Sequence, residues 1–136
     1  PAKVVTRAQM VVFLQRALQH PPSDGDYYDD DEGAWYEAAL NRLATQGFTA
    51  NCGARKFCGP EPLLRSDMAV FMTQALDLPP ASTDYFDDDN GSATEDENNR
   101  LAEAGITLGC REREYCPDES VTRGQMASFL VRAFDL

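Results

Sequence analysis

The strongest pattern along the chain is a helical stripe of apolar residues that occurs three times at a constant spacing. In the first copy Met10, Phe13 and Leu14 follow one another at intervals of three and one residues, which places them on one face of an α-helix. The methionine that opens the stripe returns as Met68 and Met126, so the copies are 58 residues apart (68 − 10 and 126 − 68). Long helices are therefore expected over about residues 6–19, 65–77 and from 122 to the C-terminal end.

A shorter helix is expected in front of each of the last two copies. Residues 35–46 have an apolar face that includes Leu40, and Gly47 follows as a typical helix stop. The equivalent segment, 94–104, has a weaker apolar face because Asn98 stands where Leu40 does. Five helices with almost no alternating β pattern predict an all-α fold.

The constant offset also predicts how the chain is divided. Residues 23–80 and 81–136 form two complete repeats, and residues 1–22 form the second half of an earlier one. A repeat of this size is too small to bury its apolar face alone, so the repeats should pack about a common axis as a pseudo-threefold bundle in a single domain, 1–136. Two explanations of the incomplete first repeat stay open: the chain is a fragment of a longer protein, or a partner supplies the missing part.

The four cysteines form two pairs that occupy the same place in each repeat. Five residues separate the members of each pair, whereas zinc sites usually have pairs separated by about two to four residues. Local disulfides are therefore predicted for Cys52–Cys58 and Cys110–Cys116, each closing a loop that stabilises the fold by about 2 to 2.5 kcal/mol. Disulfides predict a secreted protein.

The charge of the chain excludes several functions. The net charge of −11 is unsuitable for binding a nucleic-acid backbone, which needs a basic face, and suits divalent cations. Apolar runs are too short for membrane insertion. The sequence has neither a nucleophile–His–Asp set nor a glycine-rich phosphate loop, so we do not expect an enzyme.

An acidic loop precedes each short helix and could hold calcium, which prefers carboxylate and carbonyl oxygens. An EF-hand is excluded, because placing Gly33 at its sixth position puts Tyr28 at the first, where aspartate is required. Alternatively, the acids cap and charge the start of the next helix. Both interpretations stay open. The candidate ligands, in two equivalent sets, are Asp29, Asp31, Glu37, Asp87, Asp89 and Glu95.

An arginine opens each long helix: Arg7, Arg65 and Arg123. A cation is mildly unfavourable at a helix N-terminus because it faces the positive end of the helix dipole. Three recurrences of such a residue need a reason. An ion pair with a carboxylate of a neighbouring repeat, ligand binding and simple exposure are the three alternatives.

Several segments of the repeat resemble the S-layer homology (SLH) family. That family has a Phe-x-Asp-like loop, a Leu-Ala-x-x-Gly-Ile-like turn and a helix that opens with Ile-Thr-Arg-Ala-Glu-like residues. The last repeat matches with Phe86-Asp87-Asp88, Leu101-Ala102-Glu103-Ala104-Gly105-Ile106 and Val121-Thr122-Arg123-Gly124-Gln125. The preceding repeat matches with Tyr28-Asp29-Asp30, Trp35, Leu43-Ala44-Thr45-Gln46-Gly47-Phe48 and Leu64-Arg65-Ser66-Asp67.

The resemblance covers the whole chain and implies a three-repeat helical spindle that binds cell-wall polysaccharide in grooves between repeats. The disulfide pairs are not part of the general pattern and suggest a secreted subgroup. In the family the arginine contacts an acidic sugar, and the tryptophan and turn glycines lie near the groove. Carried over, the glycan-binding positions are Arg7, Arg65, Arg123, Trp35, Gly47 and Gly105.

Two functions are expected from these observations. The first is a non-catalytic module, secreted or at the cell surface, that anchors a protein to cell-wall polysaccharide. The second is a structural or protein-interaction module of an extracellular assembly, stabilised by calcium, whose partners are other envelope proteins or further copies of itself.

Overall fold

A computed structural model describes residues 3–135 and has five helices and no strands over this range, which confirms the predicted all-α fold. The predicted repeat limits at residues 1 and 136 lie outside the described residues. None of the described helices has the length and apolar character needed to cross a membrane. The helices are α1 (Arg7–Leu18), α2 (Glu37–Thr45), α3 (Arg65–Leu76), α4 (Glu95–Glu103) and α5 (Arg123–Phe134).

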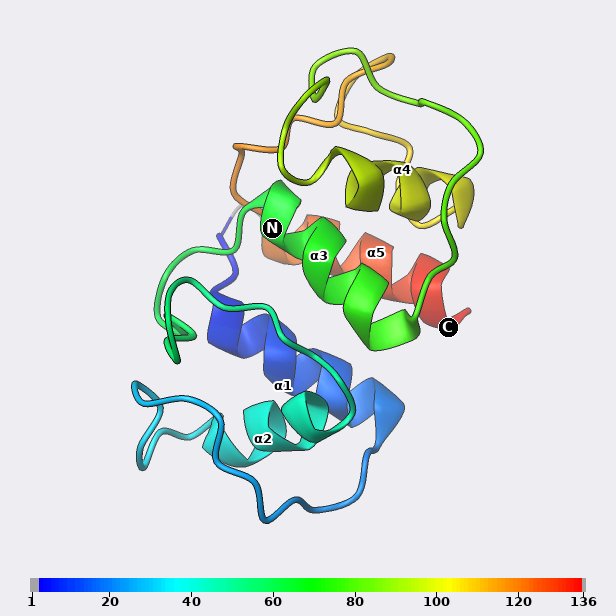
Figure 1. Cartoon of the computed structure of the whole chain (residues 1–136). Coiled ribbons are helices and arrows are strands. Elements are labelled where there is room, and N and C mark those ends of the chain that lie inside the picture. Colours follow the sequence, from blue (N-terminus) through cyan, green and yellow to red (C-terminus); the bar gives the residue numbers. More distant parts are fainter. Residues whose placement is uncertain (1–2, 136) are drawn as a thin grey trace.

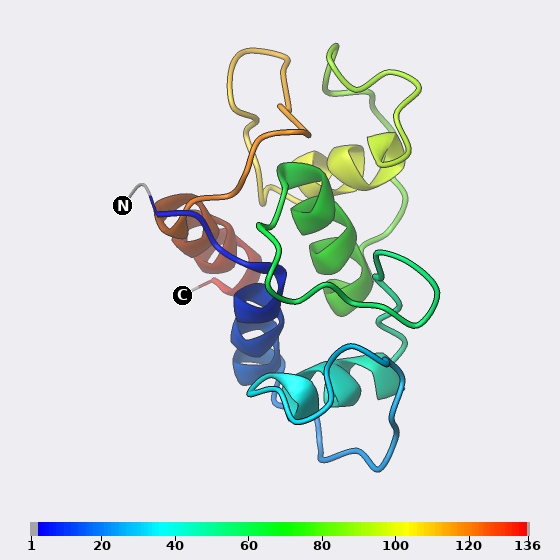
Figure 2. The same ribbon diagram turned by 90° about the vertical axis from the view of Figure 1, so that its left-hand side faces the viewer.

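The three long helices α1, α3 and α5 form the centre of the molecule, and the short helices lie outside them (Figure 1). Helix α2 packs against α1, and α4 packs against α3. Turned by 90°, the molecule shows α2 and α4 at opposite ends (Figure 2). Each short helix therefore packs on the long helix of the preceding repeat, so the repeats interlock.

Three backbone hydrogen bonds close a ring immediately before the long helices. The N–H of Val5 donates to the carbonyl of Val121 (2.9 Å), Val121 donates to Leu63 (2.8 Å), and Leu63 donates to Val5 (2.8 Å). All three residues are at most 1% exposed. This ring joins one residue from each repeat and gives the bundle its pseudo-threefold arrangement.

The long helices begin where their capping residues predict. Thr6 accepts a hydrogen bond from the N–H of Gln9, whose side chain accepts one from the Thr6 N–H, and the Thr122 cap of α5 is built in the same way. Leu64 has no side-chain acceptor, so α3 keeps only half of this box, in which Asp67 accepts the Leu64 N–H at 3.0 Å.

Helix α2 begins at Glu37 rather than at the predicted Trp35. The N–H of Ala34 donates to the carbonyl of Asp31, and the N–H of Glu37 donates to that of Ala34. These bonds form two consecutive turns, over residues 31–34 and 34–37. The second turn places Trp35 on the surface, where its side chain is 66% exposed.

Both predicted disulfides, Cys52–Cys58 and Cys110–Cys116, are present. One aspartate of each acidic loop accepts hydrogen bonds from two backbone N–H groups of the disulfide loop that follows it. Asp30 accepts from Phe57 and Cys58, and its equivalent Asp88 accepts from Tyr115 and Cys116.

Burial by itself would raise the pKa of Asp30, but the hydrogen bonds from Phe57 and Cys58 hold it below its usual value. The same bonds fix the left-handed backbone of Cys58 (φ 59°), which is uncommon for a residue other than glycine. Each acidic loop is thus tied to its own disulfide loop.

Residue differences between the repeats compensate for one another. The Tyr36 ring lies against Gly59, and any side chain at Gly59 would overlap that ring. In the next repeat Pro117 stands in the place of Gly59, and Thr94 stands in the place of Tyr36. The smaller residue at one position leaves room for the larger one at the other, so the same backbone packs in both repeats.

We predict that Leu63→Ala destabilises the protein by about 2 to 5 kcal/mol, because it removes a fully buried side chain at the ring. Leu108→Ala is the matched control, since Leu108 is 78% exposed and its truncation should change stability by less than about 0.5 kcal/mol. Urea unfolding followed by circular dichroism measures both, and equal effects would contradict the central role of the ring.

Candidate functional site

Arg7 and Arg65 are held in the same way under successive disulfide loops. The Nε–H of Arg7 donates to the carbonyl of Phe57 (2.9 Å), and that of Arg65 donates to Tyr115 (2.6 Å). Each guanidinium also lies over the ring of that aromatic residue, at 4.9 Å and 4.7 Å from the ring centre. Both arginines are buried, with 6% and 2% of their surface exposed.

A groove opens beside each of these arginines. The Arg7 groove, about 350 Å³, is also lined by Asn51, Glu61, Asp67 and Ser120. The Arg65 groove, about 300 Å³, is also lined by Thr107, Arg111, Glu119, Gln125, Ser128 and Arg132. Because the two grooves occupy equivalent places in the repeat, their differences show what each can bind.

The decisive difference is the charge next to the buried arginine. Arg7 forms an ion pair with Asp67 (Nη1 to Oδ1, 3.0 Å). Gln125 occupies the equivalent position in the Arg65 groove, and Arg65 forms no ion pair with any described residue. The Nη2 atoms of both arginines are buried without a hydrogen-bond partner, so the ion pair is what distinguishes them. Burial lowers the pKa of Arg65. The Arg65 groove therefore contains a guanidinium without an ion pair, and Glu119 is the carboxylate residue in the groove lining.

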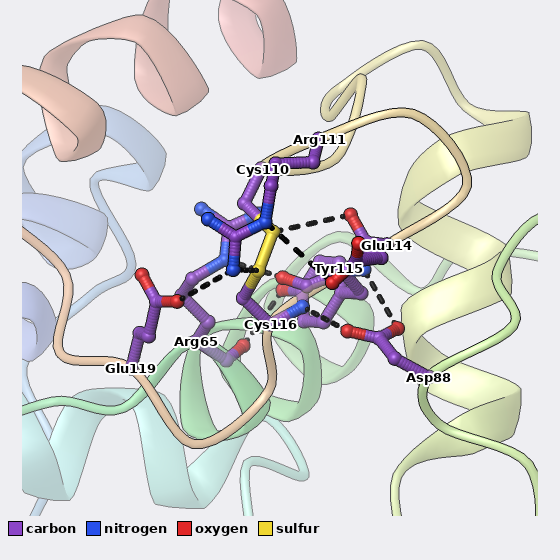
Figure 3. A network of polar contacts seen from close by, with 8 residues as sticks. All are labelled: Arg65, Asp88, Cys110, Arg111, Glu114, Tyr115, Cys116 and Glu119. Atoms are coloured by element: carbon purple, nitrogen blue, oxygen red, sulfur yellow. Dashed lines mark hydrogen bonds and ion pairs between the residues drawn. A yellow bond between two sulfur atoms is a disulfide. The ribbon is translucent and has the colours of Figure 1, made fainter.

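The rim of the Arg65 groove adds two more arginines. Arg111, within the Cys110–Cys116 disulfide loop, forms ion pairs with Glu119 (3.4 Å) and Glu114 (3.5 Å) (Figure 3). Arg132 of α5 donates to the carbonyl of Ile106 at 3.4 Å. The residues that line this groove thus include three arginines and one glutamate, Glu119, although the chain carries a net charge of −11. The groove suits a ligand with a negative group.

Arg123 differs from both because it is exposed. Its backbone N–H donates to the carbonyl of Lys3 at 2.8 Å, but no described residue accepts a hydrogen bond from its side chain. The structure therefore gives the three repeated arginines three different surroundings. Arg7 forms the ion pair, Arg65 faces an open groove without a carboxylate partner, and Arg123 is exposed.

The other predicted glycan-binding residues lie apart from the arginine grooves. Trp35 is exposed, and its ring packs edge-on against Tyr36 at 5.5 Å. Gly47 lines a cavity of about 460 Å³ between the ends of α1, α2 and α3, where the charged side chain is that of Asp77. Gly105 follows α4 with φ 78°, a conformation that favours glycine.

Two clusters of carboxylates lie where the acidic loops meet the short helices. The structure brings Asp31 together with Glu37, and Asp89 together with Glu95, as the calcium hypothesis expects. Further acids complete each cluster, and the carboxylate oxygens within a cluster lie within 4.8 Å of one another. The first acidic cluster is Asp26, Asp31, Glu32 and Glu37, and the second acidic cluster is Asp84, Asp89 and Glu95.

Asp29 and Asp87, the remaining predicted metal ligands, lie elsewhere. They form exposed ion pairs with Arg55 (3.0 Å) and Arg113 (2.8 Å) of the disulfide loops. The hydrogen bond from Arg113 holds the pKa of Asp87 below its usual value.

Asp26, Glu32 and Asp84 are not among the predicted ligands, although the offset of 58 residues relates Asp26 to Asp84. That recurrence is the signal by which the sequence could have identified both. Glu32 has no acidic counterpart, because Asn90 occupies the equivalent position.

Asp31 is the most unusual acid of the chain. Its side chain is fully buried, and neither carboxylate oxygen has a hydrogen-bond partner. Burial, followed by the charges of Glu37 and Asp26, raises the pKa of Asp31 to about 6. Its equivalent Asp89 is also buried, but Asn98 donates a hydrogen bond to Asp89 at 2.9 Å.

Comparison with known proteins gives one informative similarity. The chain is 29% identical over 109 residues to an endoglucanase of Bacillus sp. (strain KSM-635). The match covers 80% of this chain and 12% of that enzyme. No family model matches the chain, so membership of the SLH family stays a prediction. The chain is thus similar to a small segment of a carbohydrate-active protein.

We predict that Asp31 makes the metal-free protein less stable at pH 7 than at pH 4. Because its pKa is raised on folding, the folded state holds this proton more tightly, and the stabilisation is lost as pH rises through about 6. Asp31→Asn should therefore stabilise the chelator-treated protein at pH 7 by about 1 to 3 kcal/mol, since one pKa unit corresponds to about 1.4 kcal/mol. Urea unfolding of both proteins at pH 4 and pH 7 tests this, and a gain of the same size at both values would contradict it.

Proposed function

We propose that this chain is a non-catalytic, extracellular module of the SLH type that attaches a protein to an acidic cell-wall polysaccharide through the Arg65 groove. The observation that carries the proposal is the charge of this groove: Arg65 forms no ion pair with any described residue, and Arg111 and Arg132 line the groove beside it.

An acidic sugar has the group that this arrangement lacks. A guanidinium and a carboxylate match in geometry, and their charge-assisted hydrogen bonds are stronger than neutral ones. A buried charge without a partner costs free energy, so a bound carboxylate would recover part of that cost. Around it, Gln125 and Ser128 offer amide and hydroxyl groups for the neutral hydroxyls of a sugar.

The Arg65 groove suits an acidic ligand better than the Arg7 groove does. Asp67 already neutralises Arg7 and would repel an incoming carboxylate. In the Arg65 groove Gln125 carries no charge, and the rim residues Arg111 and Arg132 add positive charge. We therefore assign the main binding site to Arg65 and a weaker one to Arg7.

Similarity to an endoglucanase segment supports a carbohydrate-related module, and the family resemblance supplies the polysaccharide of the cell wall. The disulfides fit an extracellular location. The proposal of a non-catalytic role is supported by the recurrence of the same acids in both repeats, because a catalytic carboxylate pair has two different roles and is normally asymmetric.

We predict that Arg132→Ala and Arg111→Ala each weaken binding to the cell wall by about threefold to tenfold, because each removes a cation from the rim of the Arg65 groove. Both side chains are exposed, so the variants should fold normally. Arg16→Ala is the matched control, since Arg16 occupies the position of Arg132 in α1 and lines neither arginine groove.

The measurement is co-sedimentation with sacculi purified from a Bacillus strain, before and after removal of the secondary polysaccharide. Binding should disappear on the stripped sacculi and should weaken with rising salt. Equal binding to both preparations, or an equal loss in the Arg16 and Arg132 variants, would refute the proposed site.

One observation favours the alternative, a protein-interaction module. Helix α5 has no short helix packed against it among the described residues, whereas α1 and α3 do. Its Val131 is 47% exposed, and Arg123 at its start is exposed as well. Absence of sacculus binding, together with concentration-dependent self-association in sedimentation velocity, would favour this function instead.

A further inference from the structure

We propose that the first acidic cluster is a calcium-binding site whose ligands are Asp26, Asp31, Glu32 and Glu37. The proposal is independent of the glycan groove and rests on the placement of one buried carboxylate. Asp31 is 0% exposed, lies within a cluster of three other carboxylates, and has no hydrogen-bond partner for either oxygen.

A buried carboxylate needs a compensating partner. Taking an ionised group out of water is costly unless it is paired or bound to a metal. Here the nearest charged groups are themselves negative, so they add repulsion to the cost of burial. A divalent cation between the four carboxylates would give Asp31 a partner and would offset the repulsion among the negative charges.

Helix capping does not account for this arrangement. If the acids only satisfied the start of α2, backbone N–H groups would donate to the Asp31 side chain, but none among the described residues does. Glu37 accepts one such bond, from the N–H of Gly33 to its Oε1 at 3.0 Å. That bond fixes the carboxylate of Glu37 beside the loop and leaves its Oε2 available as a ligand.

The second acidic cluster is an internal comparison that shows the alternative solution. Asn90 stands in the place of Glu32, so one carboxylate is missing. Asn98 stands in the place of Leu40, and its amide donates to Asp89 at 2.9 Å. Fewer charges and a donor from the protein itself reduce the need for a cation, so the second cluster should bind calcium more weakly.

Calcium is the divalent cation that fits the ligand chemistry best. All side-chain ligands are oxygens, and calcium takes six to eight of them in flexible geometry, whereas magnesium demands an octahedron and keeps several waters. Zinc prefers nitrogen and sulfur ligands, which the cluster lacks. Two of the four acids, Asp26 and Glu32, are exposed, which gives the ion a path of entry.

The cation would stabilise more than its own loop. Asp31 directly follows Asp30, which binds the N–H groups of Phe57 and Cys58 in the disulfide loop. The carbonyl of Phe57 in turn accepts the hydrogen bond from Arg7. A bound ion therefore fixes a loop that is connected by hydrogen bonds to the centre of the bundle, and it should raise the unfolding temperature.

The test is calcium titration of the chelator-treated full chain, by isothermal titration calorimetry and by thermal unfolding. We expect one site of higher affinity and a rise in unfolding temperature with calcium. Asp31→Asn should weaken that site at least tenfold while circular dichroism shows an unchanged fold. There are two matched controls: Asp89→Asn in the second acidic cluster, and Asp24→Asn in the same acidic loop as Asp31. Both variants should keep the calcium affinity of the first acidic cluster.

Terbium luminescence gives a second readout, because Trp35 and Tyr36 lie in the turn between Glu32 and Glu37 and can sensitise a bound lanthanide. No heat, no thermal shift and no luminescence with calcium up to about 10 mM, above the range of the weak extracellular sites, would overturn the proposal. Equal losses in the Asp31, Asp89 and Asp24 variants would also overturn it, since they would indicate nonspecific attraction to an acidic chain.

Discussion

The ring of backbone hydrogen bonds between Val5, Leu63 and Val121 is the constraint on which the rest of the structure depends. Its donors and acceptors are buried and would be costly to leave unpaired, so the three repeats must meet at this point. Each ring residue lies two positions before a long helix. The ring therefore also fixes where each helix starts, and it brings Arg7 and Arg65 toward the disulfide loop of the next repeat.

Once the backbone is fixed in this way, single neighbouring residues decide what each arginine does. Arg7 and Arg65 have the same carbonyl acceptor position and the same aromatic platform. Asp67 neutralises the first, and Gln125 leaves the second unpaired. A structural role and a proposed binding role thus arise from one repeated position, and the difference between them is one carboxylate.

In the acidic loops, too, equivalent positions share a structural role or differ through a neighbouring residue. Asp30 and Asp88 have identical structural roles, because each holds the N–H groups of a disulfide loop. The next residue along the chain, Asp31 or Asp89, is buried in both repeats but differs in its surroundings. In the last repeat Asn98 supplies a hydrogen bond, and in the preceding repeat only further carboxylates are present. Positions that hold the fold together stay alike, and the proposed functions lie where the repeats differ.

The sequence by itself determined the helices, the repeat of 58 residues and the disulfide pairs, because these depend on local periodicity and on short spacings. It also brought Arg7, Arg65 and the acidic loops forward as candidates. Only the tertiary structure decided that each short helix packs on the preceding repeat, that Arg65 lacks an ion pair, and that Asp26 rather than Asp29 joins Asp31. The bonds that place Arg65 and Asp29, to Tyr115 and Arg55, join residues 50 and 26 positions apart. Such contacts depend on how the repeats pack, which local patterns along the chain do not record.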